Sequence, residues 1–348
     1  ELIFAGQDKK VVFSNRLIKE SGELLHVSWN ITWDIKSQSI YCIVRDNTEH
    51  EQDLHRLQLL GKAINNSTDA IFVNQVDAEN IKPIQITYVN PAFVKITGYN
   101  TAEIIGESPL ILAGEATDRE GIKNLGRSIC NNEPFELTTI HYKKSGEPFW
   151  VEIKSTPLDN EYGVVTHCVS ILRDITIRKQ IDLQNELIGK LVNVFNQETS
   201  LHQALHLACK EIAEHQNFSM LEIWIPNFTN NKLNRITHFT RDKVGNDFYE
   251  ASKQTDSFNF GEGLPGTVWE KEEVVTWENL GQNELFIRRK EAKHSKMQTM
   301  LGIPLIYAKQ MIGVLTLGSH KNQFELKLSL EIIKGIQHSL SSKVYWKK

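Results

Sequence analysis

IVRDNTEHEQ occupies residues 43–52, and ILRDITIRKQ occupies residues 171–180. The two stretches share an apolar start, an Arg-Asp pair and a polar, helix-like continuation. The triplet Ser-Gly-Glu also occurs twice, at 21–23 and at 145–147. An internal repeat of this kind predicts two copies of one structural unit, so it bears directly on the fold.

Each copy predicts three antiparallel strands that lead directly into a helix. Ser-Gly-Glu is typical of a hairpin turn, and alternating runs such as VSWNITW indicate half-buried strands. The second copy is longer, and we place the extra residues in its turn at 158–163, compared with 34–39 in the first copy.

The motif Arg-Asp-x-Thr marks the exit from each predicted sheet. Asp and Thr are good N-cap residues because their oxygens accept the free N–H groups of a first helical turn. Thr48 and Glu51 have capping-box spacing. We therefore expect helices to begin at these exits, and we predict that signals leave the sheets through Arg45, Asp46, Thr48, Arg173, Asp174 and Thr176.

The segment between the two copies predicts a mixed helix and strand unit. Short strands are expected at 70–76 and 84–89. Asn90 is a suitable N-cap before a proline, and Gly98 is a suitable left-handed stop for the same helix. A longer helix is expected at about 118–130, before the second set of three strands.

Composition and charge exclude several classes of protein. The chain has 348 residues, of which 40% are hydrophobic and 24% charged, as in ordinary globular proteins. A net charge of −4 gives no basic footprint for nucleic acid. No apolar run approaches the length of a membrane helix. Because the chain starts at Glu1 with no signal-peptide pattern, we expect an excerpt of a longer protein.

The four cysteines do not have the spacing of a disulfide framework or a metal site. We expect each of Cys42, Cys130, Cys168 and Cys209 to be a buried small apolar residue, in a reducing, cytoplasmic compartment. His202 and His206 lie four apart on a predicted helix, but a third metal ligand is lacking nearby in the sequence, so no metal site is expected.

Two stretches carry a resemblance to known families. YVNPAFVKITGYNTAEIIGE, the turn KKSGEPFW and the terminal RDIT together resemble a PAS domain over residues 58–176. Residues 1–48 then resemble the C-terminal half of a preceding PAS domain, followed by a connector helix at 49–64. A second connector is expected at 177–196. Residues 185–343, with GEGLPGTVW and then GIPL and GVLTL, resemble a GAF domain.

The resemblance implies the fold class and the kind of cofactor to consider. Both families are α+β modules in which an antiparallel sheet with flanking helices can cover a ligand cavity. The PAS stretch is similar to the light-sensing flavin branch, whose helix carries a cysteine that bonds to the flavin. Pro109 stands at that position, and the strand asparagines that hold the flavin ring fall at His141 and Val151. We therefore expect no flavin.

Haem and bilin are not expected either. The helix histidine that holds haem in some PAS sensors is lacking between residues 56 and 140, which leaves only Cys130 as a conceivable thiolate ligand. The covalent cysteine of bilin-binding GAF domains is not evident, because Cys209 lies in the first helix of its segment. The ligand-binding residues therefore stay unknown.

The second connector carries apolar residues at heptad spacing. Ile181, Ile188 and Phe195 lie seven apart, and Leu191 supplies the intervening position. Sustained heptad spacing buries residues against a partner helix, so we predict a parallel homodimer seam. The alternative is that this helix packs on its own domain.

These patterns predict a sensory input region that binds a small ligand or senses a cytoplasmic cue. The resemblance implies a downstream effector, foremost a bacterial histidine kinase of a two-component system. A phosphoacceptor box and a Gly-rich ATP segment are lacking, so we expect no enzyme activity within these residues. The alternatives are a dimerising adaptor or the input region of a cyclase. A redox GAF enzyme would need several cysteines, and Cys209 is alone.

Overall fold

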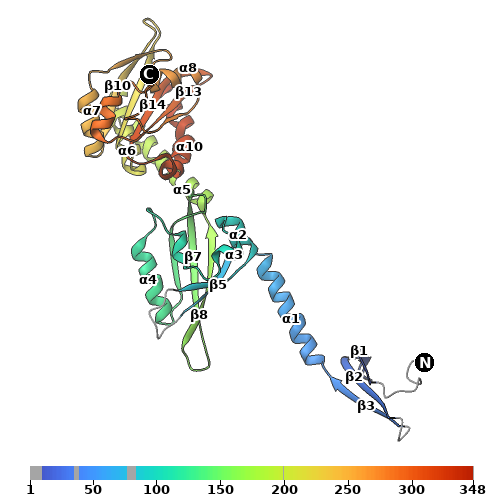
Figure 1. Ribbon diagram of the computed structural model, residues 1–348. Coiled ribbons are helices and arrows are strands. Elements are labelled where there is room, and N and C mark those ends of the chain that lie inside the picture. The colour runs from blue at the N-terminus through green and yellow to red at the C-terminus, as the bar shows by residue number, and fades with distance from the viewer. Residues whose placement is uncertain (1–9, 35–38, 77–83, 199, 348) are drawn as a thin grey trace.

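The computed structural model describes residues 10–34, 39–76, 84–198 and 200–347. Three sheets follow one another along an extended molecule, and helices α1 and α5 lie between them (Figure 1). Within these described ranges, no helix combines the length and the apolar character that a membrane crossing requires.

The first sheet and its helix match the predicted unit. Strands pair antiparallel in the order β1-β2-β3, and α1 follows directly; their bounds are β1 Lys10–Ile18, β2 Leu24–Asp34, β3 Ser39–Asp46 and α1 Thr48–Asn65. Gly22 has a φ of 84°, which places the predicted hairpin turn between β1 and β2. The predicted turn at 34–39 falls largely outside the described residues. Every side chain of α1 lies at least partly open to solvent. The C-terminal end of α1 meets the second module, where Asn90 Nδ2 donates to Ile64 O at 3.1 Å (Figure 1).

The second module, which we call the PAS-like module, has one antiparallel sheet of five strands in the order β5-β4-β8-β7-β6. Its elements are β4 Ala70–Gln75, β5 Gln85–Val89, α2 Pro91–Thr97, α3 Thr101–Ile104, the 3-10 helix η1 Pro109–Leu112, α4 Arg119–Cys130, β6 Phe135–Tyr142, β7 Pro148–Asp159 and β8 Val165–Asp174. The predicted strands at 70–76 and 84–89 and the helix at 118–130 are thus confirmed.

Capping explains where the short helices begin and end. The Asn90 side chain accepts a hydrogen bond from Phe93 N at 3.0 Å, and Gly98 ends α2 with a φ of 78°. The capping box predicted from Thr48 is not formed. Asn47 is the N-cap of α1, because the Thr48 hydroxyl is occupied by a bond from His26 N of β2.

The third module, the GAF-like module, has six strands in the order β11-β10-β9-β14-β13-β12. Its elements are α5 Thr176–Gln197, α6 Leu201–Gln216, β9 Met220–Asn227, β10 Lys232–Thr240, α7 Lys243–Ser252, β11 Ser257–Asn259, α8 Gly263–Lys271, β12 Val275–Trp277, α9 Arg289–Ser295, β13 Thr299–Tyr307, β14 Gln310–Ser319 and α10 Gln323–Lys347. The expected α+β class with antiparallel sheets is confirmed for all three modules.

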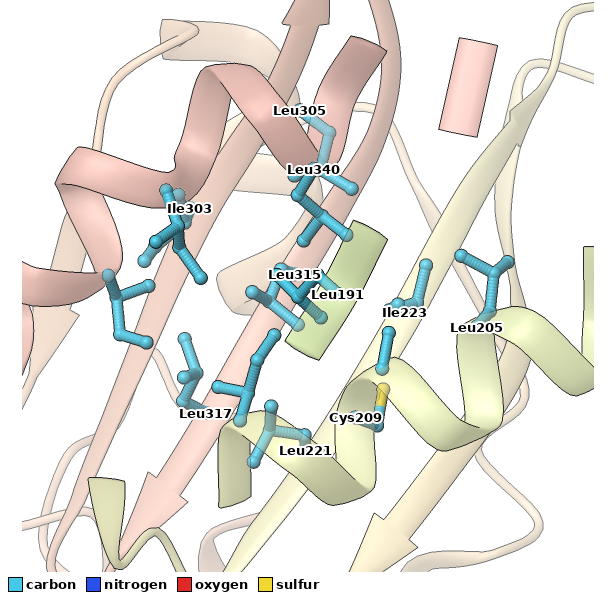
Figure 2. Packing of buried hydrophobic residues seen from close by; sticks show 14 of the residues in the cluster. Leu191, Leu205, Cys209, Leu221, Ile223, Ile303, Leu305, Leu315, Leu317 and Leu340 are labelled. Carbon is cyan, nitrogen blue, oxygen red and sulfur yellow. The ribbon is translucent and has the colours of Figure 1, made fainter. Parts of the chain in front are cut away.

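Two separate cores cover the two faces of this six-stranded sheet. Helices α5, α6 and α10 pack on one face, where Leu191, Cys209 and Leu340 meet strand residues such as Ile303 and Leu315 (Figure 2). Helices α7, α8 and α9 enclose the second core on the opposite face. The second half of α5 is therefore part of the GAF-like module.

The cysteines divide into two pairs. Cys168 and Cys209 are buried as predicted. The same expectation was wrong for Cys42 and Cys130, which are exposed. Cys42 lies on β3, whose sheet has no covering helix layer in Figure 1, and Cys130 is the last residue of α4.

Candidate functional site

The inner face of the PAS-like sheet carries a polar cluster within an apolar core. Its members come from three adjoining strands: Asn74 on β4, Cys168 and Ser170 on β8, and Ser155 on β7. Each of these residues is at most 3% exposed. Polar groups in such a position need partners, because burial removes their hydrogen bonds to water.

The cluster leaves one strong acceptor open. Ser155 Oγ and Ser170 Oγ lie 2.8 Å apart, and Asn74 Nδ2 donates to Ser170 Oγ at 3.4 Å. Asn74 Oδ1 has no hydrogen-bond partner among the described residues. A buried amide oxygen without a partner is destabilising, so Asn74 Oδ1 is a candidate contact for a ligand N–H or O–H group.

His141 on β6 is a second open group on the same face. It is 5% exposed, and its Nδ1 also lacks a partner in the described part of the chain. Burial lowers the pKa of His141 from 6.5 to about 4, so its ring is neutral near neutral pH. A neutral imidazole has one donor and one acceptor nitrogen, and it can therefore bind either kind of ligand group.

The helical side of this module covers the sheet with apolar side chains. At the position where the light-sensing branch has a cysteine, this chain has Pro109. Pro109 begins η1, and Leu112 at its end is 1% exposed in the apolar core. The buried thiol of the module is Cys168 on the sheet. Burial raises the pKa of Cys168, which keeps it protonated and a weak nucleophile.

The two sheet exits have the same hydrogen bonds. At the second exit, Thr176 N donates to Asp174 Oδ1 at 2.9 Å, and Trp150 N donates to Thr176 Oγ1 at 2.9 Å. At the first exit, Thr48 N donates to Asp46 Oδ1 and His26 N donates to Thr48 Oγ1, both at 2.9 Å. Each threonine therefore joins the first turn of the helix to a neighbouring strand: Thr48 joins α1 to β2, and Thr176 joins α5 to β7.

Arg173, near the end of β8, connects the second exit to Asp69, which lies just before β4 at the start of the PAS-like module. Its Nε and Nη2 contact both carboxylate oxygens of Asp69, with the shortest distance 2.6 Å, and its Nη1 lies 3.9 Å from a Glu152 oxygen. Arg45 occupies the corresponding position on β3. The transmission role predicted for these exit residues stays a prediction.

The residues of the predicted seam are not gathered on one exposed face. Leu191 is 1% exposed and Phe195 is 6% exposed, and both pack in the core of their own module (Figure 2 shows Leu191). Ile188 is partly buried against the same core, whereas Ile181 is 50% exposed. Leu191 and Phe195 therefore pack on their own domain, which was the alternative to a dimer seam. A seam through Ile181 stays a prediction.

One charged cluster was missed by the sequence analysis. Glu222 on β9 is fully buried, and it pairs with Arg288 and Arg235 at 2.9 Å each. The available signal was a lone glutamate within the apolar strand SMLEIWI, which a buried strand tolerates only with a cationic partner. Its partner Arg288 lies 66 residues further along the chain, so the pair could not be found by spacing.

Comparison with known proteins matches the two modules to families. Residues 68–176 match the PAS domain family, and residues 198–334 match the GAF domain family. One PAS domain is matched, and the assignment of residues 1–48 to a second one stays a prediction. These matched ranges lie within the boundaries expected from the sequence, 58–176 and 185–343.

Among the curated relatives is a blue-light-activated histidine kinase of Brucella canis. It is 35% identical over 103 residues, which are 29% of this chain and 21% of the relative, so the chain spans only a fifth of that protein. A solved LOV domain of the Erythrobacter litoralis EL346 blue-light activated histidine kinase is 29% identical. The match covers 31% of this chain and 95% of the LOV domain, with a TM-score of 0.28. The GAF domain of an Acinetobacter phosphoenolpyruvate-protein phosphotransferase is 21% identical, covers 47% of this chain and 93% of that domain, and has a TM-score of 0.37.

These relatives correct the expectation that flavin is absent. The chain is 35% identical over 103 residues to a blue-light-activated histidine kinase, so the substitutions at Pro109, His141 and Val151 do not exclude flavin. Two open groups lie on the inner face, Asn74 Oδ1 and His141 Nδ1. Through Cys168, Asn74 is level with Pro157 of β7, whereas His141 is level with Phe149, so the two groups are too far apart to contact one ring.

Proposed function

We propose that this chain, which contains a PAS domain followed by a GAF domain, is the sensory input region of a signalling protein whose effector is a histidine kinase. The observation that carries the proposal is the direct continuity of β8 with α5, whose second half is built into the GAF core. A change at the PAS sheet therefore reaches the GAF domain without crossing a loop. The histidine kinase relatives support the choice of effector.

The ligand that the PAS interior favours is a planar heteroaromatic molecule of the flavin class. When bound, a flavin would supply absorption of blue light. Asn74 would hold the polar edge of the ring through its open Oδ1. Phe93, Ile104 and Leu112 close the apolar side of the same interior.

The path out of the PAS domain begins at the inner face. Ser170 belongs to the polar cluster and lies on β8, and the same strand ends at Asp174. The Asp174 carboxylate accepts from Thr176 N, and the Thr176 hydroxyl holds Trp150 N of β7. A shift of β8 relative to β7 therefore changes the position of the first turn of α5.

The test is the absorption spectrum of the purified chain after expression with riboflavin. We expect flavin bands, and we expect Asn74→Leu to reduce the flavin content because it removes the open acceptor. Asn124→Leu, at the partly buried Asn124 of α4, is the matched control, and it should retain the wild-type content. A well-folded wild-type chain that takes up no flavin would contradict the proposed ligand.

A further inference from the structure

The GAF core contains a complete receptor for a guanidinium group. Both oxygens of the Glu222 carboxylate receive N–H groups of Arg288, at 2.9 Å from Nη1 to Oε1 and 2.9 Å from Nη2 to Oε2. This parallel pairing is the strongest arrangement of a guanidinium with a carboxylate. Glu222 is 0% exposed and Arg288 is 2% exposed, so water does not screen the pair.

Aromatic rings enclose the same guanidinium. The Arg288 Cζ atom lies 4.9 Å from the ring centre of Phe248, and 5.8–5.9 Å from the ring centres of Trp224, Phe258 and Phe286. Aromatic faces attract delocalised cations, and the attraction grows when water is excluded. The four rings and the Glu222 carboxylate, which we call the GAF cage, therefore select a flat cation.

The cage groups on β9 and the Arg288 side chain that occupies the cage come from different kinds of structure. Glu222 and Trp224 lie on β9, which pairs with β10 on one side and β14 on the other. Arg288 instead lies just before α9, on a connecting segment whose Leu285 is 72% exposed and whose Ile287 is 51% exposed. Arg288 Nε is buried and has no hydrogen-bond partner among the described residues. Glu222 and Trp224 are thus rigidly framed by the sheet. Phe286 lies two residues before Arg288 on the same connecting segment, and Arg288 is held incompletely.

The charges of the site permit the exchange of one cation for another. Burial alone would raise the pKa of Glu222, but Arg288 and Arg235 together hold that pKa below its ordinary value, so the carboxylate is ionised. Arg235 Nη1 stays bonded to Glu222 Oε1 when Arg288 leaves. An incoming guanidinium restores the balance, whereas an anion would face the buried carboxylate.

We propose that the GAF cage is a binding site for small molecules that carry a guanidinium group, and that Arg288 occupies it as an internal ligand. The external ligand enters by displacing the Arg288 side chain, which loosens the first turn of α9 while Phe286 stays in the cage. Because the internal ligand competes, the apparent affinity of the wild-type protein is reduced by the fraction of time that Arg288 is bound.

Calorimetric titration with agmatine tests this site in the whole chain. Agmatine carries a guanidinium, and putrescine, its matched control, carries an ammonium in the same place. We expect Arg288→Ala to bind agmatine at least about tenfold more tightly than the wild type, because the internal competitor is removed. Arg289→Ala, at the exposed neighbouring position, should bind like the wild type. Adding Glu222→Gln to Arg288→Ala should abolish binding.

A folded Arg288→Ala variant that fails to bind agmatine, or that binds putrescine equally well, would overturn the proposal. Should Arg288→Ala not fold, hydrogen exchange in the wild-type chain decides the matter. Agmatine at millimolar concentration should speed the exchange of amides in the first turn of α9, where Ala292 N donates to Arg288 O, and putrescine should not. Unchanged exchange with agmatine would overturn the proposal in that case.

Discussion

At the scale of single residues, the buried imidazole of His141 makes the stability of the PAS domain depend on pH. Its folded-state pKa of about 4 lies below the ordinary value of 6.5. Between these values the unfolded chain binds a proton that the folded domain does not, so the free energy of unfolding falls as the pH is lowered. The full loss is about 3 kcal/mol below pH 4.

His141→Asn should flatten this dependence, because the asparagine binds no proton. We expect urea unfolding of the PAS domain at about pH 7 and about pH 4.5 to give nearly equal stabilities for the variant, apart from contributions of other groups. An unchanged pH slope in His141→Asn would show that another group titrates.

Residue-level prediction from sequence succeeded where the cause is local. Asn90 and Gly98 cap α2 as predicted, because N-cap bonds and left-handed stops involve neighbours within a few positions. Arg288 could not be assigned in this way. Its role depends on Glu222, which lies on β9, 66 residues earlier in the chain, and meets it only in the folded core. The open Oδ1 of Asn74 is likewise a property of the packed interior.

At the scale of elements, Thr176 joins α5 to β7. Thr176→Val removes the acceptor of the Trp150 N–H while retaining the shape of the side chain. We expect a loss of about 1–2 kcal/mol in the stability of the PAS domain, measured by urea unfolding. Thr176→Ser keeps the hydroxyl and should lose much less. Equal losses in the two variants would assign the effect to the methyl group instead.

Helix α5 has two halves with different roles. Leu191→Ala should destabilise the GAF domain by about 2–5 kcal/mol, because it opens a cavity in a closed core. Ile177→Ala, at a side chain that is 75% exposed, should change stability by less than about 0.5 kcal/mol. If Ile181 belongs to a dimer seam, replacing it by alanine should weaken self-association, as measured by light scattering over a concentration series. Undiminished association would exclude that seam.

The helices themselves were predictable from periodicity, but their partners were not. The heptad spacing of Ile181, Ile188 and Phe195 is equally compatible with a partner helix and with the domain's own core. The deciding neighbours, α6 and α10, are brought beside α5 only by the fold of the whole GAF domain. The apolar pattern of one helix indicates that one of its faces is buried. It does not indicate whether that face packs on a partner helix or on the domain's own core.

At the scale of the whole molecule, the PAS and GAF domains have separate cores and two connections. The first connection is the continuous helix α5. The second is the ion pair between Lys327 Nζ of α10 and Glu147 of the β6–β7 hairpin, at 2.7 Å. Exposed ion pairs contribute little to stability, so we expect α5 to carry the coupling. The Gln184 side chain, bonded to Glu331 O, marks where α5 enters the GAF domain.

Insertions between Ile181 and Asp182 distinguish the two connections, because this part of α5 precedes the buried half. Seven extra residues return the helix nearly to its original phase and lengthen it by about 10 Å, whereas two residues rotate it by about 200°. In a full-length protein that carries the effector, we expect the seven-residue insertion to retain regulated output and the two-residue insertion to lock or abolish it. Loss of regulation in both variants would indicate that the Glu147–Lys327 contact transmits the signal, since both insertions separate that pair. Equal tolerance of both would make α5 a passive tether between independent domains.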